Sequence, residues 1–154
     1  MDETYNTLNT VLVRLFNDIM TIEEKAITSG EFSNITNNDM HVIDAIGIAE
    51  PRNMSSIAKS LSVTMGTLTI AINNLVKKGY VNRVRSEKDR RVVLISLTPK
   101  GKKAYQHHQN FHDEMIRAVI AGMDAQEIQV LGCALTNLIE FFDHYGQERP
   151  YIKT

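Results

Sequence analysis

The feature that most constrains the fold is a change of hydrophobic period in the middle of the chain. Residues 53–61 and 64–78 carry apolar side chains at helical spacing and are separated by a turn at residues 62–63. Residues 80–85 and 92–97 are then rich in β-branched side chains at the two-residue period of strands, with a polar segment between them. A short helix, a tight turn, a longer helix and a β-hairpin, in this order, predict a winged helix-turn-helix.

Capping residues mark the ends of the expected helices. Asn53 and Thr64 can accept hydrogen bonds from the first backbone N–H groups of the two short helices, and Gly79 can end the second one. Helical spacing predicts further helices from Leu8 to about Ala26, from Thr36 up to Pro51, from Thr98 to near Gly122 and from Asp124 onward. The chain is therefore expected to be mostly α-helical, with a small β-hairpin wing.

The expected organisation has four parts. Residues 1–35 would form an N-terminal dimerisation helix and residues 36–98 a winged helix-turn-helix DNA-binding domain. Residues 99–146 would form C-terminal dimerisation helices, followed by a tail at residues 147–154. Dimerisation is expected because the terminal helices are too apolar to remain exposed alone.

Charge is distributed very unevenly along the chain. The net charge is −1, but residues 51–105 hold twelve Lys and Arg against two acidic residues, whereas the remainder is strongly acidic. A basic segment between acidic ends is the pattern expected when one part of a protein faces a polyanion, although charge runs are usually only a solvated surface. A winged helix used only for protein–protein contact is the competing interpretation, and this asymmetry disfavours it.

The second short helix presents the candidate base-reading side chains. If Leu68, Ile72 and Leu75 are buried, the opposite face carries threonines that can bond a base edge or a phosphate, an Asn that can pair with adenine, and apolar side chains that can meet thymine methyl groups. The candidate DNA-binding residues of this helix are Thr64, Met65, Gly66, Thr67, Thr69, Ile70 and Asn73. This face has no Arg or Lys before Lys77, so A·T-rich half-sites are expected; the alternative is that these are merely exposed helix residues.

The hairpin loop supplies the second group of candidates. An Arg on a loop can enter a narrow minor groove, where A·T tracts deepen the negative potential. Asp89 would orient a neighbouring Arg, or would only staple the hairpin together with Arg91. The candidate DNA-binding residues of the wing are Arg85, Lys88, Asp89, Arg90 and Arg91.

At these residues the chain resembles the winged-helix repressors of the multiple-antibiotic-resistance-regulator (MarR) type. The family pattern is Asp-x-Arg, a strand, then Leu-Thr-x-x-Gly, and the chain has Asp89-Arg90-Arg91 followed by Leu97-Thr98-Pro99-Lys100-Gly101. The resemblance covers nearly the whole chain. It implies an obligate homodimer, joined by the first and the last two helices, whose recognition helices read a pseudo-palindrome about one DNA turn apart.

A narrower resemblance points to one regulatory role. Residues 40–47, 63–69, 84–91 and Phe111-His112 are similar to the fatty-acid-synthesis repressors of Gram-positive bacteria (FabT-like). This resemblance implies control of type II fatty-acid genes, with long-chain acyl-acyl-carrier-protein as co-repressor and an acyl chain as effector.

Histidines form a separate candidate site. His108 and His112 are four residues apart and share one helix face, which is a usable spacing for two imidazole ligands. Zinc-uptake repressors of the same superfamily resemble the chain at Glu24, His41, His108 and His112, which implies a zinc site and a zinc-responsive repressor of metal-uptake genes. The alternative, which we favour from the sequence, is a hydrogen-bonded polar knot at the same four residues.

Several classes of protein are disfavoured. There is no Gly-rich phosphate loop, nucleophile elbow or convergent carboxylate pair, so an enzyme is not expected. The single cysteine, Cys133, excludes a disulfide framework and is expected to be buried and inert. The polar, acidic start and the lack of a long apolar run make the cytoplasm the expected location.

Overall fold

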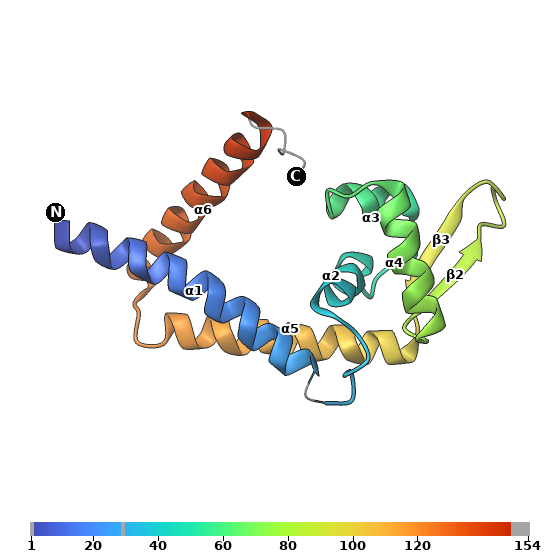
Figure 1. Cartoon of the computed structure of the whole chain (residues 1–154), viewed down its shortest axis with the longest axis horizontal. Coiled ribbons are helices and arrows are strands. Elements are labelled where there is room, and N and C mark those ends of the chain that lie inside the picture. The colour runs from blue at the N-terminus through green and yellow to red at the C-terminus, as the bar shows by residue number, and fades with distance from the viewer. Residues whose placement is uncertain (1, 29, 149–154) are drawn as a thin grey trace. The chain divides into compact units, whose positions relative to one another are not determined.

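The computed structural model describes residues 2–28 and 30–148 (Figure 1). They form helices connected by short loops, with one small antiparallel sheet. The elements are α1 (Asp2–Thr28), α2 (Asn37–Ile46), β1 (Arg52–Asn53), α3 (Met54–Ser60), α4 (Met65–Lys77), β2 (Val81–Arg85), β3 (Val93–Leu97), α5 (Pro99–Ile120) and α6 (Ala125–Glu148). This is the mostly helical fold with a small β wing that the sequence predicts.

Two compact units divide the chain within α5, between His112 and Asp113. The first unit contains α1 to α4, the sheet and the first part of α5; the second contains the end of α5 and α6. The predicted division at residues 35, 98 and 146 stays a prediction.

Capping boxes stand at the starts of α2 and α6, where the sequence predicts them. Thr36 and Asp39 form a reciprocal capping box at the start of α2, and Asp124 and Glu127 exchange backbone-to-side-chain bonds in the same way before α6. The prediction that α2 extends up to Pro51 is wrong, because Gly47 adopts a φ of 70° and the helix ends at Ile46.

The helix-turn-helix consists of α3 and α4. The Asn53 side chain accepts from Ser56 N at 2.8 Å, and Thr64 Oγ1 accepts from Thr67 N at 3.2 Å, so both predicted caps are confirmed. The turn between the helices contains Ser62 with a φ of 53°, a left-handed conformation that lets the chain reverse within a few residues.

The wing is larger than the hairpin predicted from the sequence. β2 and β3 pair antiparallel from Val81 with Leu97 to Arg85 with Val93. The two-residue strand β1 pairs with the other edge of β3, giving the order β1-β3-β2. A strand this short carries no periodic signal, so only pairing with β3 reveals it.

One hydrophobic core holds these elements of the first unit together. α4 contributes the predicted stripe of Leu68, Ile72 and Leu75, which are at most 1% exposed. Around them lie apolar side chains from α2, α3, the sheet and the start of α5, including Met40, Ile43, Ile57, Tyr80, Ile95 and Ala104. Since the buried face of α4 is anchored on all of these elements, its opposite face is held outward on a rigid base.

The second unit leaves most of α6 exposed. Cys133 is exposed, so the expectation of a buried thiol is wrong for the single chain. The small residues on either side of it, Gly132 and Ala134, are exposed as well, because no other element of this unit covers that face of α6. The end of the predicted tail, residues 149–154, lies outside the described residues.

Within residues 2–28 and 30–148, no single helix is long and apolar enough to span a membrane; α5 and α6 pass that test only when taken together as a broken pair.

Candidate nucleic-acid interface

The outward face of α4 carries the predicted base-reading residues. Met65, Gly66, Thr67, Ile70 and Asn73 are exposed, whereas Thr69 is half-buried. Ile70 is 66% exposed, so its side chain is accessible to a partner on this face. A helix with a fully anchored core face and an apolar and amide outer face is shaped to enter a groove rather than to rest in solvent.

The threonine hydroxyl groups of this face are already engaged within the helix. Thr64 Oγ1 lies 2.9 Å from Thr67 Oγ1 and also caps the helix, and Thr69 Oγ1 donates to Met65 O at 2.7 Å. The Thr69 hydroxyl keeps its lone pairs, so it can still accept from a base amino group but has no proton to offer. The Thr64 side chain is therefore used to cap the N-terminus of α4.

Arg83 on β2 holds the side chain of Asn73. Its Nη1 donates to Asn73 Oδ1 at 3.0 Å, which connects the wing to the recognition helix. Because a guanidinium only donates, the amide oxygen must face it, and the Asn73 Nδ2 hydrogens remain for an acceptor such as a purine N7. Sequence reasoning does not single out Arg83; its place two residues before Arg85, on the same face of the strand, is the signal that could have found it.

The wing loop is braced by hydrogen bonds from backbone N–H groups to side-chain oxygens. Asp89 Oδ1 accepts from Arg91 N at 3.0 Å, and Asp89 N donates to Ser86 Oγ at 3.4 Å. The prediction that Asp89 orients an Arg side chain through its charge differs from this geometry: within the described chain, Asp89 makes no ion pair, and it shapes the loop instead.

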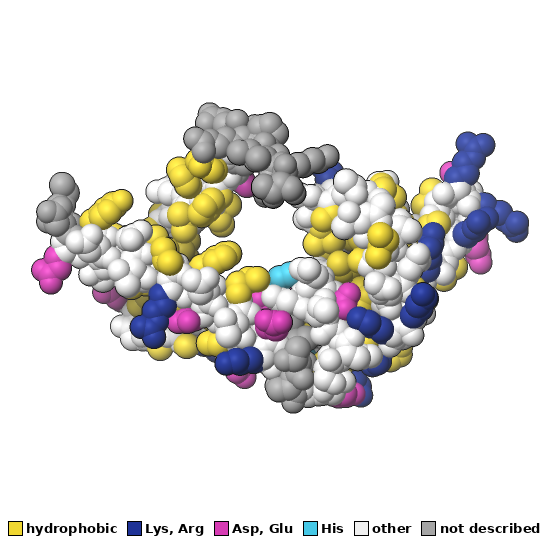
Figure 2. Space-filling model, in the orientation of Figure 1, with side chains coloured by type: hydrophobic (Ala, Val, Ile, Leu, Met, Phe, Trp, Pro, Cys, Tyr) yellow, Lys and Arg dark blue, Asp and Glu magenta, His cyan; other side chains and the backbone are white. Residues whose placement is uncertain are grey.

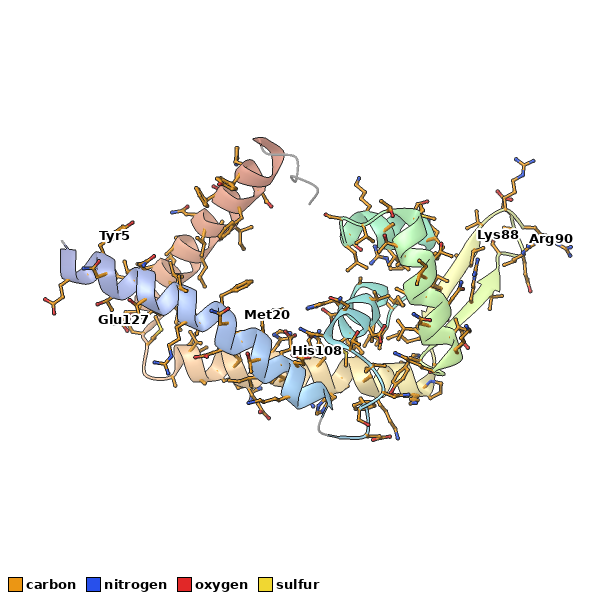
Figure 3. All side chains as sticks on the ribbon, viewed as in Figure 1. Tyr5, Met20, Lys88, Arg90, His108 and Glu127 are labelled. Atoms are coloured by element: carbon orange, nitrogen blue, oxygen red, sulfur yellow. The ribbon has the colours of Figure 1, made fainter. Side chains whose placement is uncertain are left out.

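Basic side chains project from this loop. Arg85, Lys88, Arg90 and Arg91 are exposed, and Figure 3 shows Lys88 and Arg90 pointing away from the tip of the hairpin. In the space-filling view, Lys and Arg gather over α4 and the wing (Figure 2). Long charged side chains on a braced loop are suited to contacting phosphates or a narrow minor groove.

A surface hollow lies between the helix-turn-helix and the wing. It is lined by Ser55 from α3, by Met65 and Thr69 from α4, and by Arg83 and Arg91 from β2 and the loop. Arg83 and Arg91 therefore border the same hollow as the candidate base-reading residues Met65 and Thr69, which connects the exposed face of α4 to the wing.

A cluster of histidines lies away from this surface. His108 on α5 is 2% exposed and lies beside α1 and α2 (Figure 3). Its Nε2 is 3.1 Å from His112 Nε2 and 3.3 Å from Glu23 Oε1, and His112 Nε2 is 3.4 Å from the same oxygen. His41 offers a further nitrogen, within 4.8 Å of the Glu23 and His108 donor atoms.

The carboxylate in this cluster comes from Glu23, where the sequence predicts Glu24. Glu23 is 3% exposed, whereas Glu24 is on the exposed surface of α1. Successive residues of a helix lie about 100° apart, so only one of two neighbouring glutamates can face α2 and α5. The sequence offers no local signal for choosing between them.

Burial lowers the pKa of His108 below its ordinary value, and the neighbouring His112 lowers the pKa further. Asp44 and Glu23 act in the opposite direction, so their negative charges only partly offset the burial. The His108 imidazole is therefore neutral at pH 7, with a lone pair on one of its ring nitrogens.

A family model matches the part of the chain that contains the helix-turn-helix and the wing. Residues 28–107 match the family described as transcriptional regulator SarA/Rot. Among solved structures, Streptococcus pneumoniae FabT in complex with DNA is similar with a TM-score of 0.83 and 43% identity, covering 92% of this chain and 99% of that chain.

Curated relatives are transcriptional regulators as well. SarZ of Staphylococcus saprophyticus is 38% identical over 104 residues, which is 66% of this chain and 70% of SarZ. YhjH of Bacillus subtilis is 26% identical over 122 residues, and the match covers 79% of this chain but only 59% of YhjH. The chain therefore spans less than two thirds of that relative's length.

Proposed function

The chain belongs to the MarR-type winged-helix transcriptional regulators, with residues 28–107 matching SarA/Rot, and from this premise we propose that it is a sequence-specific repressor acting as a homodimer on a pseudo-palindromic operator. Transcriptional regulators of this fold are not enzymes. The place of action that we propose is the cytoplasm. The observation that carries the proposal is the continuous surface formed by the outer face of α4 and the wing.

The α4 face and the wing contact different parts of the DNA. The α4 residues Thr67, Thr69, Ile70 and Asn73, with Met65 and Gly66 at the helix start, read base edges in the major groove. The wing side chains of Arg85, Lys88, Arg90 and Arg91 supply charge to phosphates or to the minor groove, and Asp89 keeps their loop in shape.

A homodimer is supported by the exposed apolar side chains of the terminal helices. In α1, Leu8, Leu12 and Phe16 are 57%, 43% and 70% exposed, and in α6, Ile139 and Phe142 are each 61% exposed. Apolar exposure repeated along two long helices is more than scattered surface residues account for, and a second copy of the chain would bury it.

The regulated genes that we propose are those of fatty-acid synthesis, with acyl-acyl-carrier-protein as co-repressor. The support is the resemblance at residues 40–47, 63–69 and 84–91 together with the 43% identity to FabT over most of the chain. The alternative, a zinc-responsive repressor of metal-uptake genes, uses the same DNA-binding surface and differs in the genes bound.

The experiment is selection of genomic fragments of the source organism by the purified full-length protein, followed by sequencing. Fragments upstream of fatty-acid-synthesis genes are expected, with two half-sites about one helical turn apart. Acyl-acyl-carrier-protein is then expected to tighten binding to the selected fragments.

A variant without the wing arginines is the matched control for the selection. A protein carrying Arg90→Ala and Arg91→Ala keeps the fold but is expected to enrich nothing. Enrichment of metal-uptake promoters instead would replace the fatty-acid proposal by its alternative. Equal recovery by the parent and the double variant would contradict the assignment of the DNA-binding surface.

A further inference from the structure

A hydrogen bond between two exposed side chains joins the wing to the recognition helix. Arg83 Nη1, on β2, donates to Asn73 Oδ1, on α4, at 3.0 Å. The next residue of α4, Asn74, has the same side chain and is also exposed, but its amide makes no hydrogen bond within the described chain. Of two neighbouring and chemically identical amides, the wing therefore holds one.

The two-residue period of β2 explains why Arg83 reaches α4. β2 lies beside α4 (Figure 1), and Val81 at its start is 2% exposed, in the core that also contains the buried stripe of α4. Residues two apart project from the same face of a strand, so Arg83 leaves β2 on the side of α4. Val84 projects from the opposite face and is 61% exposed. The core therefore fixes the strand from which Arg83 extends.

The bond determines which end of the Asn73 amide is left for a partner. A guanidinium group only donates hydrogen bonds, so Oδ1 must face Arg83 and the Nδ2 hydrogens remain available. An unheld amide can turn over and offer either its oxygen or its nitrogen. Both purines present the acceptor N7 in the major groove, whereas cytosine presents an amino donor there. An Asn73 that is held in this way favours a purine over a cytosine.

The bond matters most once water has left the surface. At an exposed site, water competes for the same donors and acceptors, so the bond contributes little to folding. In a DNA groove, an amide oxygen without a donor would carry the cost of its lost hydration. Arg83 supplies that donor from the protein itself, and its positive charge suits the neighbourhood of phosphates.

We infer that Arg83 is a positioning residue for base recognition: it holds the Asn73 amide so that α4 selects a purine at one position of each half-site. The wing strand thereby contributes to sequence preference as well as to charge. This inference deepens the proposed DNA-binding function and rests on it.

The test is selection from a library of random DNA duplexes by the full-length protein and its variants, followed by sequencing. Asn73→Ala identifies the position that Asn73 reads, because the preference there is lost. The parent should favour a purine over cytosine at this position by about five-fold or more, and Arg83→Met should reduce that ratio to within about two-fold of unity. Preferences at the other positions should survive in Arg83→Met, which shows that the variant is folded.

Asn73→Asp reverses the chemistry that meets the base. Its carboxylate can still accept from Arg83, but it presents an oxygen where Asn73 presents Nδ2. Cytosine should therefore be favoured over purines at the same position in this variant, because its amino group is the matching donor. Retention of the purine preference by Asn73→Asp would overturn the inference.

Three controls separate positioning from loss of charge. Arg85→Met removes a charge from the same face of β2 and should weaken binding to all sequences about equally while the purine preference remains. Asn74→Ala removes an amide that is not held and should alter no preference. In the Asn73→Ala background, Arg83→Met should cause no further loss of preference, because no amide is left to position. A further loss there, or loss of the purine preference in Arg85→Met, would assign Arg83 a role in charge alone.

Nitrogen-15 relaxation of the side-chain amides tests the bond in the DNA-free protein. The Asn73 Nδ2 group should be more ordered in the parent than in Arg83→Met, and more ordered than that of Asn74. Equal order of Asn73 in the two proteins overturns the inference, as does an Arg83→Met protein that selects DNA with an undiminished purine preference. Enrichment of no sequence by the parent contradicts the proposed function instead, and the relaxation data then still support or overturn the hold of Arg83 on Asn73.

Discussion

Gly101 shows how a single residue can join the wing to α5. The Thr98 hydroxyl donates to Gly79 O at 2.7 Å and accepts from Gly101 N at 3.0 Å, while Thr98 N donates to Tyr80 O at 3.0 Å. These bonds press the first turn of α5 against the backbone of Tyr80. A Cβ at position 101 would lie 2.1 Å from Tyr80 O, so the glycine of the Leu97-Thr98-x-x-Gly101 spacing has a steric reason in this chain.

Gly101→Ala is therefore expected to lower the free energy of unfolding by roughly 3 kcal/mol, because backbone on both sides must shift to admit the methyl group. Chemical denaturation at one fixed protein concentration measures the change. Gly66→Ala is the control: its new Cβ would meet only Thr64 Oγ1, at 3.9 Å, and stability should be unchanged or slightly higher. Similar losses in both variants would refute the close approach at Gly101.

Arg90 and Arg91 are each expected to affect DNA affinity through one side-chain charge. Arg91→Ala keeps the backbone N–H that Asp89 accepts, so the loop should keep its shape while the charge is lost. If each arginine contacts one phosphate, each alanine variant should reduce the slope of log affinity against log salt by about 0.9. Fluorescence anisotropy with operator DNA across a salt series provides the measurement.

Arg14→Ala is the matched control, since the ion pair of Arg14 with Asp18 on α1 is exposed and far from the wing in sequence. The same arginine charge is removed there without touching the wing, so the salt slope should not change. A reduced slope for Arg14→Ala, or an unaltered slope for Arg90→Ala and Arg91→Ala, would point to a different basic surface.

At the scale of elements, one ion pair links the start of α2 to the end of α4. Asp39 Oδ2 accepts from Lys78 Nζ at 2.7 Å and also from Thr36 N at 3.1 Å in the capping box. The side chains of Lys78 and Asp39 are 31% and 11% exposed, so solvent screens the pair only in part. The C-terminal end of the recognition helix α4 is thereby bonded to α2 by an ion pair as well as packed against it.

A double-mutant cycle with Asp39→Asn and Lys78→Met should give a coupling free energy of about 1 kcal/mol, because Asn retains an oxygen for the cap while losing the charge. Thermal or chemical unfolding of the four proteins provides it. The exposed pair Arg14 and Asp18, measured by the same cycle, should give a smaller value of about 0.3 to 0.5 kcal/mol. No difference between the two cycles would mean that the first pair gains nothing from its partial burial.

For the whole molecule, the proposed homodimer predicts that the exposed apolar side chains of α1 and α6 are buried by a second copy. We expect sedimentation equilibrium to give twice the chain mass of 17.4 kDa. Leu12→Asp with Phe16→Asp places two charges one turn apart on α1, where burial by a second copy would be costly, and should give the monomer mass.

Val84→Asp is the control for that change. Val84 on β2 is 61% exposed, close to the values on α1 and α6, but lies on the DNA-binding wing. This variant should remain a dimer. A parent protein that sediments as a monomer at micromolar concentration, or a Val84→Asp variant that dissociates, would contradict dimerisation through the terminal helices.

Much of the fold follows from signals that act over a few residues. The caps at Thr36, Asn53, Thr64 and Asp124 each bond to a backbone N–H three positions away, and so the sequence alone predicts them. The same holds for the buried stripe of α4, whose spacing follows the helical repeat. The exposed face of α4 was predictable for the same reason, because it lies opposite the buried stripe.

What only the tertiary structure decided depends on residues far apart in the chain. β1 exists because it pairs with β3, and Asn73 is oriented because Arg83 reaches it from another element. Glu23 rather than Glu24 joins the histidines because α1 turns that residue toward α5, 85 positions later. The sequence by itself determined which segments form helices or hairpin strands and where the capped helices α2, α3, α4 and α6 begin, through short-range hydrogen bonds and hydrophobic period, but not the end of α2 or the existence of β1. Long-range packing alone determined which side chains meet, because neither period nor capping specifies how one element is rotated against another.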